Sequence, residues 1–223
     1  MKEPKILLGI PCAPQVDTNA VTGLMAACHA VMVRGGKVAN FVYRRTDVAR
    51  NTFVKQLLES DCDWLMMLDS DHLHPVNLVA NFVDLLQAKP EVKILSGWNY
   101  RRSAPYEPMA YQFDDKGKIA SIKPGWSANS FMKVGAVATC VLMVHRRVFE
   151  AMTMPWFYYA YSTESEMLNN SEDISFCKKL HEETDFDIWV HTSLTSPHIT
   201  LATVGNDTAY REWLAAQEAE DAK

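Results

Sequence analysis

Short apolar runs and segments of helical periodicity alternate over the first 97 of the 223 residues, and this alternation is the strongest constraint on the fold. The apolar runs predict four strands, at residues 5–10, 38–43, 64–68 and 92–96. The segments between them predict helices at residues 21–33, 48–59 and 75–87. Such alternation is typical of an α/β fold in which a mostly parallel sheet is covered by helices on both faces.

The pattern changes beyond residue 100. Residues 109–113 and 118–122 flank the turn sequence Asp114-Asp115-Lys116-Gly117 and predict a β-hairpin, a small antiparallel element. The later segments predict a buried strand, two helices and a last strand, within residues 134–144, 146–152, 171–182 and 187–190. Because no linker separates the two halves, we expect a single domain over residues 1–223.

The charge and the cysteines limit the class of protein. The formal net charge is -5 with a pI near 5.8, whereas strong non-specific nucleic-acid binding requires clustered basic charge. No run approaches the roughly 18 apolar residues of a membrane-spanning helix, and no signal peptide is visible. The five cysteines are scattered without a CxxC pair, as in proteins with reduced thiols. We therefore expect a cytoplasmic protein without a membrane span.

The sequence Asp69-Ser70-Asp71 follows the apolar run at residues 64–68 directly. Ligands of open parallel sheets gather at the carboxyl ends of strands, so these carboxylates should open into a cleft. Two aspartates one residue apart can face one hard cation, and Mg²⁺ or Mn²⁺ shares its coordination sphere readily with substrate phosphates. The alternative is a solvated turn in which an aspartate caps the next helix.

Several further motifs appear in a fixed order along the chain. They are Arg50-Asn51 at a helix, Asp69-Ser70-Asp71 after a strand, the apolar segment at residues 135–147, Glu172-Asp173 at a helix start, and Pro197-His198-Ile199. In this order the sequence resembles GT-A glycosyltransferases, most closely the short soluble family 2-like enzymes of bacterial or phage type. The resemblance implies a Rossmann-like GT-A domain with a nucleotide-sugar-binding half (residues 1–100), an acceptor-side half (101–205) and an acidic C-terminal helix or tail (206–223).

The resemblance also implies a metal site. Asp71, with Asp69 directly or through water, would hold Mn²⁺ or Mg²⁺, and His198 would supply a late imidazole ligand. The cation would neutralise the charge that develops on the departing nucleotide. A hydrogen-bonded surface histidine is the alternative for His198. His72 and His74 flank the acidic motif and either line the cleft or are solvated loop residues.

Asp173 is the predicted general base and Glu172 its catalytic neighbour. A carboxylate within hydrogen-bond reach can take the proton that an acceptor hydroxyl loses as it attacks, and this arrangement favours inversion at the anomeric carbon. Both acids also stand in the first turn of a predicted helix, where negative charge stabilises the helix dipole without any catalytic role.

The donor is expected to be a nucleotide sugar, with UDP favoured by its frequency in the family. Its predicted contacts lie after the strands and on one helix: Pro11, Cys12, Ala13, Arg50, Asn51, Asp69, Ser70, Gly97 and Trp98. Trp98 would stack on a sugar face or belong to the core. The acceptor hydroxyl stays open among a protein, a glycan and a modified nucleobase.

Two other functions compete with this prediction. A haloacid-dehalogenase-like phosphatase also carries its nucleophile in a strand-end DxD motif, although that motif follows the first strand and not the third. The second competitor is a non-catalytic module that binds sugar nucleotides. The presence of Asp69, Asp71 and Asp173 together favours an enzyme over such a module.

Overall fold

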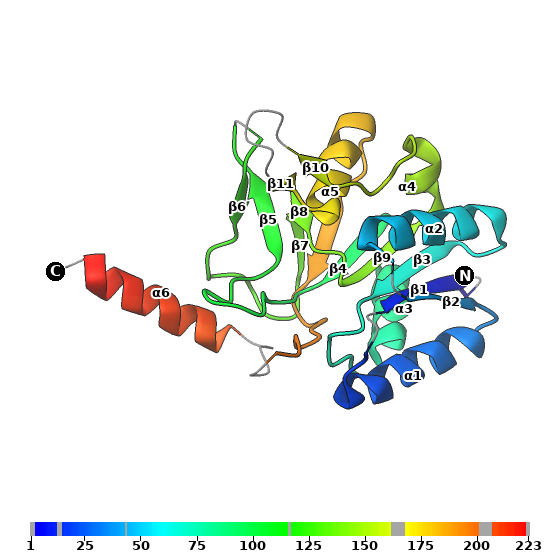
Figure 1. The fold of residues 1–223 in the computed structure, drawn as a ribbon, viewed down its shortest axis with the longest axis horizontal. Coiled ribbons are helices and arrows are strands. Elements are labelled where there is room, and N and C mark those ends of the chain that lie inside the picture. Colours follow the sequence, from blue (N-terminus) through cyan, green and yellow to red (C-terminus); the bar gives the residue numbers. More distant parts are fainter. Residues whose placement is uncertain are drawn as a thin grey trace.

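A computed structural model describes residues 3–12, 15–42, 44–115, 117–161, 168–200 and 207–221. Its centre is a seven-stranded sheet of order β2-β1-β3-β9-β4-β12-β7 (Figure 1). Five strands run in one direction: β1 (Ile6–Cys12), β2 (Lys37–Val42), β3 (Trp64–Leu68), β4 (Ile94–Gly97) and β12 (Ile188–His191). The other two run against them: β7 (Phe131–Val134) and β9 (Val141–His145).

Helices cover both faces of this sheet and enclose two hydrophobic cores (Figure 1). One face carries α1 (Thr18–Met32) and α3 (Leu78–Ala88). The other carries α2 (Thr46–Glu59), α4 (Arg146–Ala151) and α5 (Glu172–Glu183). The five residues of β3 are all buried, as expected for a strand that is apolar on both sides.

The apolar run at residues 134–144 contains more than the one buried strand expected there. The chain turns twice within it, and β9 lies antiparallel between β3 and β4. The pairing of β3 with β9 ends at Leu68 and Val141, and the Asp69 N–H then donates to the Cys140 carbonyl at 2.9 Å. This last contact determines where the acidic motif leaves the sheet.

Two small antiparallel sheets stand beside the central one. The predicted hairpin is confirmed, since β5 (Ala110–Phe113) pairs with β6 (Ile119–Ser121), and β5 also pairs with β8 (Ala136–Val137). The second sheet joins β10 (Ala160–Tyr161) to β11 (Leu168–Asn170). The helix α6 (Thr208–Asp221) projects from the body at the C-terminal end (Figure 1).

The predicted α/β class, with a mostly parallel sheet and a small antiparallel element, is therefore confirmed. Among the residues described, no helix has both the length and the apolarity needed to cross a bilayer.

Candidate active site

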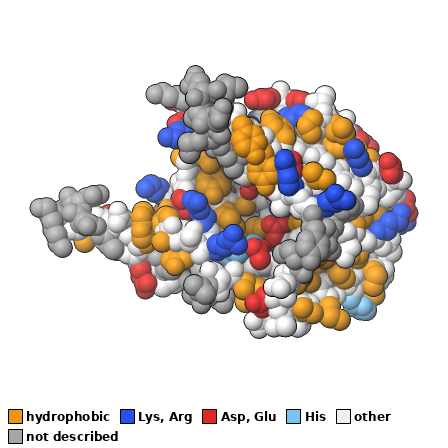
Figure 2. All heavy atoms as spheres, in the orientation of Figure 1, with side chains coloured by type: hydrophobic (Ala, Val, Ile, Leu, Met, Phe, Trp, Pro, Cys, Tyr) orange, Lys and Arg blue, Asp and Glu red, His pale blue; other side chains and the backbone are white. Residues whose placement is uncertain are grey.

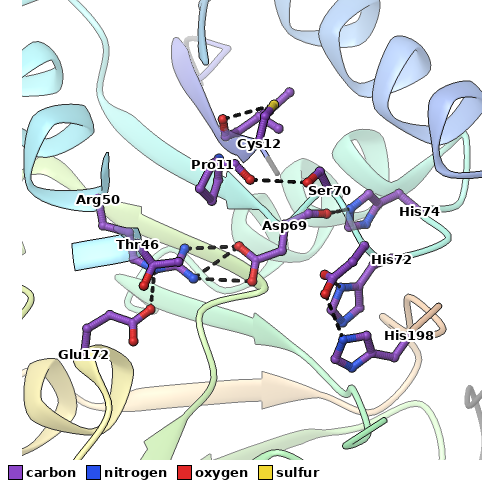
Figure 3. Close-up of polar contacts among 12 residues, drawn as sticks. Pro11, Cys12, Thr46, Arg50, Asp69, Ser70, His72, His74, Glu172 and His198 are labelled. Atoms are coloured by element: carbon purple, nitrogen blue, oxygen red, sulfur yellow. Dashed lines mark hydrogen bonds and ion pairs between the residues drawn. The ribbon is translucent and has the colours of Figure 1, made fainter. Parts of the chain in front are cut away.

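The two aspartates of the acidic motif leave the end of β3 toward different partners, and Figure 3 shows Asp69 directed at Arg50. Asp69 faces α2, where both terminal nitrogens of Arg50 contact its carboxylate at 3.1 to 3.3 Å. Asp71 faces the late histidine, with 3.2 Å between its Oδ2 and His198 Nε2. Asp69 thus forms an ion pair with Arg50, whereas Asp71 lies beside an imidazole.

Arg50 is buried and joins three elements through one guanidinium. Arg50 contacts Asp69 at the end of β3, and its Nε also donates to Oε1 of Glu172 at 3.2 Å. Glu172 is the first residue of α5. Burial alone would lower the pKa of Arg50, but the charges of Asp69 and Glu172 outweigh it and raise that pKa above its ordinary value. The acidic motif and the start of α5, 103 residues apart in sequence, are therefore neighbours.

This bridge makes Arg50 a stability determinant. We expect Arg50→Met to lower the free energy of unfolding by about 3–5 kcal/mol, because it leaves two largely buried carboxylates without a counter-charge. Urea denaturation measures the change. Arg45→Met is the matched control, since the side chain of Arg45 is 64% exposed and its pair with Asp47 should contribute only about 0–1 kcal/mol. Equal effects of the two substitutions would contradict a structural role for the buried bridge.

Asp71, His72 and His198 form a cluster whose candidate ligand atoms all lie within 4.8 Å of one another. A two-residue antiparallel bridge between His72 and His198 brings the acidic loop and the late segment together, and their rings stack at 4.1 Å. His72 Nδ1 lies 2.9 Å from Asp71 Oδ1. The structure thus unites two of the three predicted metal ligands and adds His72, while Asp69 stays with Arg50.

The hydrogen bonds of the two imidazoles fit a metal site. His198 Nδ1 faces the Tyr100 carbonyl at 3.3 Å, and because a carbonyl only accepts, Nδ1 carries a proton and Nε2 is left for a proton or cation shared with Asp71. His72 Nε2 is buried and has no hydrogen-bond partner among the described residues. Partial burial opposes ionisation of Asp71, but hydrogen bonds from His198 and His72 hold its pKa well below the usual range.

The sequence identified His72 only as a candidate lining residue. Its position directly after the acidic motif was the available signal, but a solvated loop histidine shows the same pattern. His72 is only 1% exposed and contacts His198, which lies 126 positions later. Both properties arise from the tertiary structure.

His74 holds the backbone of the acidic loop. Its Nε2 lies 2.8 Å from the Asp69 carbonyl and its Nδ1 lies 3.0 Å from Ser196 Oγ. Burial lowers the pKa of His74 to about 4, so the imidazole is neutral at pH 7, donating from Nε2 and accepting at Nδ1. Gly23 of α1 permits this packing, since a Cβ there would lie 2.1 Å from the His74 carbonyl oxygen.

The side chain of Asp173 lines a cleft of about 370 Å³ between α5 and the small sheet of β5, β6 and β8. Arg101, Glu107 and Tyr111 also line this cleft. The Ser171 hydroxyl donates to Asp173 Oδ1, and the Ile174 N–H donates to the same oxygen at 2.8 Å. Burial, followed by the charge of Glu172, raises the pKa of Asp173 above its ordinary value.

Glu172 and Asp173, both predicted as catalytic, therefore differ in their surroundings. Glu172 is 6% exposed and contacts Arg50, whereas the carboxylate of Asp173 meets the cleft. The Ser171 side chain makes no capping bond to the backbone of α5, because its hydroxyl is turned to Asp173.

The predicted donor loop after β1 lies beside the acidic motif. The Ser70 hydroxyl donates to the Pro11 carbonyl at 3.4 Å, which ties the ends of β1 and β3 together (Figure 3). Cys12 Sγ faces the Ile10 carbonyl at 3.6 Å. Ala13 lies outside the described residues.

The remaining predicted donor residues have structural partners of their own. Asn51 uses its amide nitrogen on the carbonyls of Asp47 and Phe157, and its amide oxygen accepts from two backbone N–H groups. Gly97 approaches the Leu194 carbonyl so closely that a Cβ would lie 2.8 Å from it. Trp98 is 1% exposed and belongs to the core, which matches the second of its two predicted roles.

Figure 2 shows Lys and Arg side chains beside Asp and Glu side chains across the middle of one face of the molecule. Arg102 is 63% exposed and its Nη1 lies 3.6 Å from Asp71 Oδ2. No motif in the sequence distinguishes Arg102 from other surface arginines. An exposed guanidinium at this place can meet an anionic ligand without first losing a buried partner.

No protein-family model and no curated protein matches the sequence. Among solved structures, A197 from STIV has a TM-score of 0.59 at 16% identity, over 88% of this chain and 86% of that one. A CMP:2-keto-3-deoxy-manno-octonic acid synthetase complexed with CTP has a TM-score of 0.47 at 12% identity, over 97% and 99% of the two chains. A glycosyltransferase involved in the glycosylation of the major capsid of PBCV-1 has a TM-score of 0.38 at 14% identity, over 84% and 92%.

The likeness to A197 establishes the fold, and at this identity it establishes the fold alone. The chain has a GT-A-like α/β fold, as the order of its motifs predicted.

Proposed function

We propose that this protein is a metal-dependent glycosyltransferase that transfers a sugar from a nucleotide-diphosphate sugar, with UDP the favoured nucleotide, to a hydroxyl acceptor. The observation that carries the proposal is the cluster of Asp71, His72 and His198 at the carboxyl end of β3. Ligands of open α/β sheets bind at this end of the strands. The Arg50 bridge supports it, because this bridge joins the end of β3 to Glu172, the residue before Asp173.

The cluster fits a divalent cation. One carboxylate and two imidazoles suit Mn²⁺ better than Mg²⁺, which prefers oxygen ligands, and the unpartnered Nε2 of His72 fits a site that accepts a further ligand. When bound, the cation would neutralise the charge that develops on the departing nucleoside diphosphate. Arg102 would bind an oxygen of the same diphosphate from the exposed side.

Asp173 is the proposed general base. It faces the cleft, its Oδ1 is oriented by Ser171 and Ile174, and it would take the proton of the acceptor hydroxyl as that oxygen attacks the anomeric carbon. Attack from the face opposite the leaving diphosphate inverts the configuration. Glu172 would act through Arg50 by holding α5 against the end of β3.

The raised pKa of Asp173 gives the reaction a characteristic acidic limit. A base works only when ionised, so the transfer rate should fall as the pH decreases through this pKa, and the fall should begin above the ordinary aspartate value of about 3.9. The pH profile of kcat/KM at saturating Mn²⁺ measures the limit. A rate that stays constant down to about pH 4 would contradict the assignment of Asp173.

A donor screen tests the function as a whole. Thermal shift is measured for the protein with Mn²⁺ and each of a panel of UDP- and GDP-sugars, and the stabilising donor is then followed for slow hydrolysis and for transfer. We expect one nucleotide sugar to stabilise the protein only when Mn²⁺ is present. Absence of any Mn²⁺-dependent donor would refute the proposal, and donor binding without hydrolysis or transfer would favour a non-catalytic module.

The phosphatase alternative is less well supported. A nucleophilic aspartate needs an accessible carboxylate, whereas Asp69 contacts Arg50 through both of its oxygens. Metal-dependent release of phosphate from p-nitrophenyl phosphate at a robust rate would nevertheless favour the phosphatase.

A further inference from the structure

A second cavity lies on the other side of residues 98–100 from the cluster of Asp71, His72 and His198. Its volume is about 300 Å³, at the lower end of the range of small-ligand pockets. Its lining includes Trp98, Tyr100, Trp126, Thr195, Asp207 and Arg211. The first half of the chain, the loop before β7 and the start of α6 thus all contribute to it.

The cavity combines aromatic faces with hydrogen-bonding groups of both kinds. The ring of Trp126 is half-buried and lies 4.7 Å from that of Trp98, at an angle of 55°. Arg211 donates to Asp207, and its guanidinium lies 5.6 Å from the centre of the Trp126 ring. The Tyr100 hydroxyl accepts from Trp98 Nε1 at 3.0 Å and can donate its own proton.

This combination matches the chemistry of a saccharide. A sugar ring has apolar C–H faces that stack on aromatic planes, and a rim of hydroxyls that both donate and accept hydrogen bonds. The guanidinium of Arg211 donates, the carboxylate of Asp207 accepts, and Trp126 offers a partly exposed ring.

The cavity is also next to the proposed reaction centre. The Tyr100 side chain lines the cavity, while the Tyr100 carbonyl faces Nδ1 of His198, a member of the proposed metal site, at 3.3 Å. Thr195 lines it three residues before His198. Tyr100 is therefore the residue that separates a ligand held here from the cluster of Asp71, His72 and His198.

We propose that this cavity binds a saccharide unit of the acceptor, so that the acceptor is a glycan. The assignment to the acceptor rests on the proposed transferase function, whereas saccharide binding itself does not. Trp126 is the main contact, and Arg211 with Asp207 binds the hydroxyl rim.

Binding is measured with the full chain on an array of neutral-hexose, N-acetylhexosamine and uronic-acid oligosaccharides, without donor or metal. We expect the wild type to bind one glycan class and Trp126→Ala to weaken that binding by about 10-fold, through loss of the stacking surface. Trp126→Phe keeps a ring and should retain binding within about 3-fold. Arg211→Ala, which leaves the aromatic rings in place, should also weaken binding.

The matched control is Trp189→Ala, which removes a half-buried tryptophan that packs on Lys89 and Phe131 outside the cavity and should leave binding unchanged. Binding to none of the glycans, or equal binding by wild type and Trp126→Ala, would overturn the proposal. Preferred binding of single-stranded oligonucleotides over glycans would overturn it as well.

The Mn²⁺-dependent donor screen separates this inference from the proposed function. A wild type that binds a nucleotide sugar but no glycan refutes the saccharide cavity and leaves the transferase standing. A wild type that binds a glycan through Trp126 but no nucleotide sugar supports the cavity and refutes the transferase.

Discussion

Asp71→Ala is expected to abolish Mn²⁺-dependent binding of the nucleotide sugar. Asp71 is the only carboxylate of the cluster, and both His72 and His198 contact it, so its loss removes the charge that attracts the cation and the group that orients two imidazoles. Loss of a residue that merely supports a metal ligand costs about 10–100-fold in metal affinity, and loss of a charged ligand should cost at least about 100-fold. Titration calorimetry with Mn²⁺, alone and with donor, measures the effect.

Asp84→Ala is a suitable control for this experiment, because Asp84 is exposed on α3 and belongs to no part of the cluster. It should bind Mn²⁺ and donor like the wild type. Retention of Mn²⁺-dependent donor binding by Asp71→Ala would remove the basis for a metal site at the end of β3.

Asp173→Asn is expected to remove transfer while donor binding is unchanged. The amide has the same shape as the carboxylate but cannot take a proton, and general-base catalysis typically contributes about 10²–10⁴-fold to the rate. The substitution also leaves the Arg50 bridge intact, because that bridge uses Glu172. The rate of transfer at saturating donor, with the donor affinity measured in parallel, gives the two quantities separately.

Asp185→Asn provides the same chemical change at an exposed position just after α5. Its transfer rate should equal that of the wild type. If Asp173→Asn transfers at the same rate, Asp173 is not the base, and its raised pKa only reflects burial beside Glu172.

Much of the secondary structure could be predicted from local patterns. The run at residues 64–68 is β3 to the residue, and the hairpin and the helix after Ser171 appear where the sequence placed them. The helix predicted at residues 48–59 begins earlier, at Thr46, and its N-cap residue Arg45 pairs with Asp47 of the first turn. Helix ends depend on such short contacts, and several residue types compete for them.

The order of the strands in the sheet could not be predicted from local sequence patterns. The strand β9 lies antiparallel between β3 and β4, and its pairing with β3 joins residues more than 70 positions apart, such as Leu68 and Val141. An apolar run specifies that a strand is buried, but the choice of neighbour depends on how all the elements pack together.

By itself the sequence determined the α/β class and the place where a strand delivers two aspartates, because hydrophobic periodicity and the order of residues are local properties. Only the tertiary structure decided what each acid does: Asp69 meets the buried Arg50, and Asp71 meets His72 and His198. The physical reason is that a carboxylate takes its chemical character from the charges and burial around it. Those surroundings come from segments that only folding brings together.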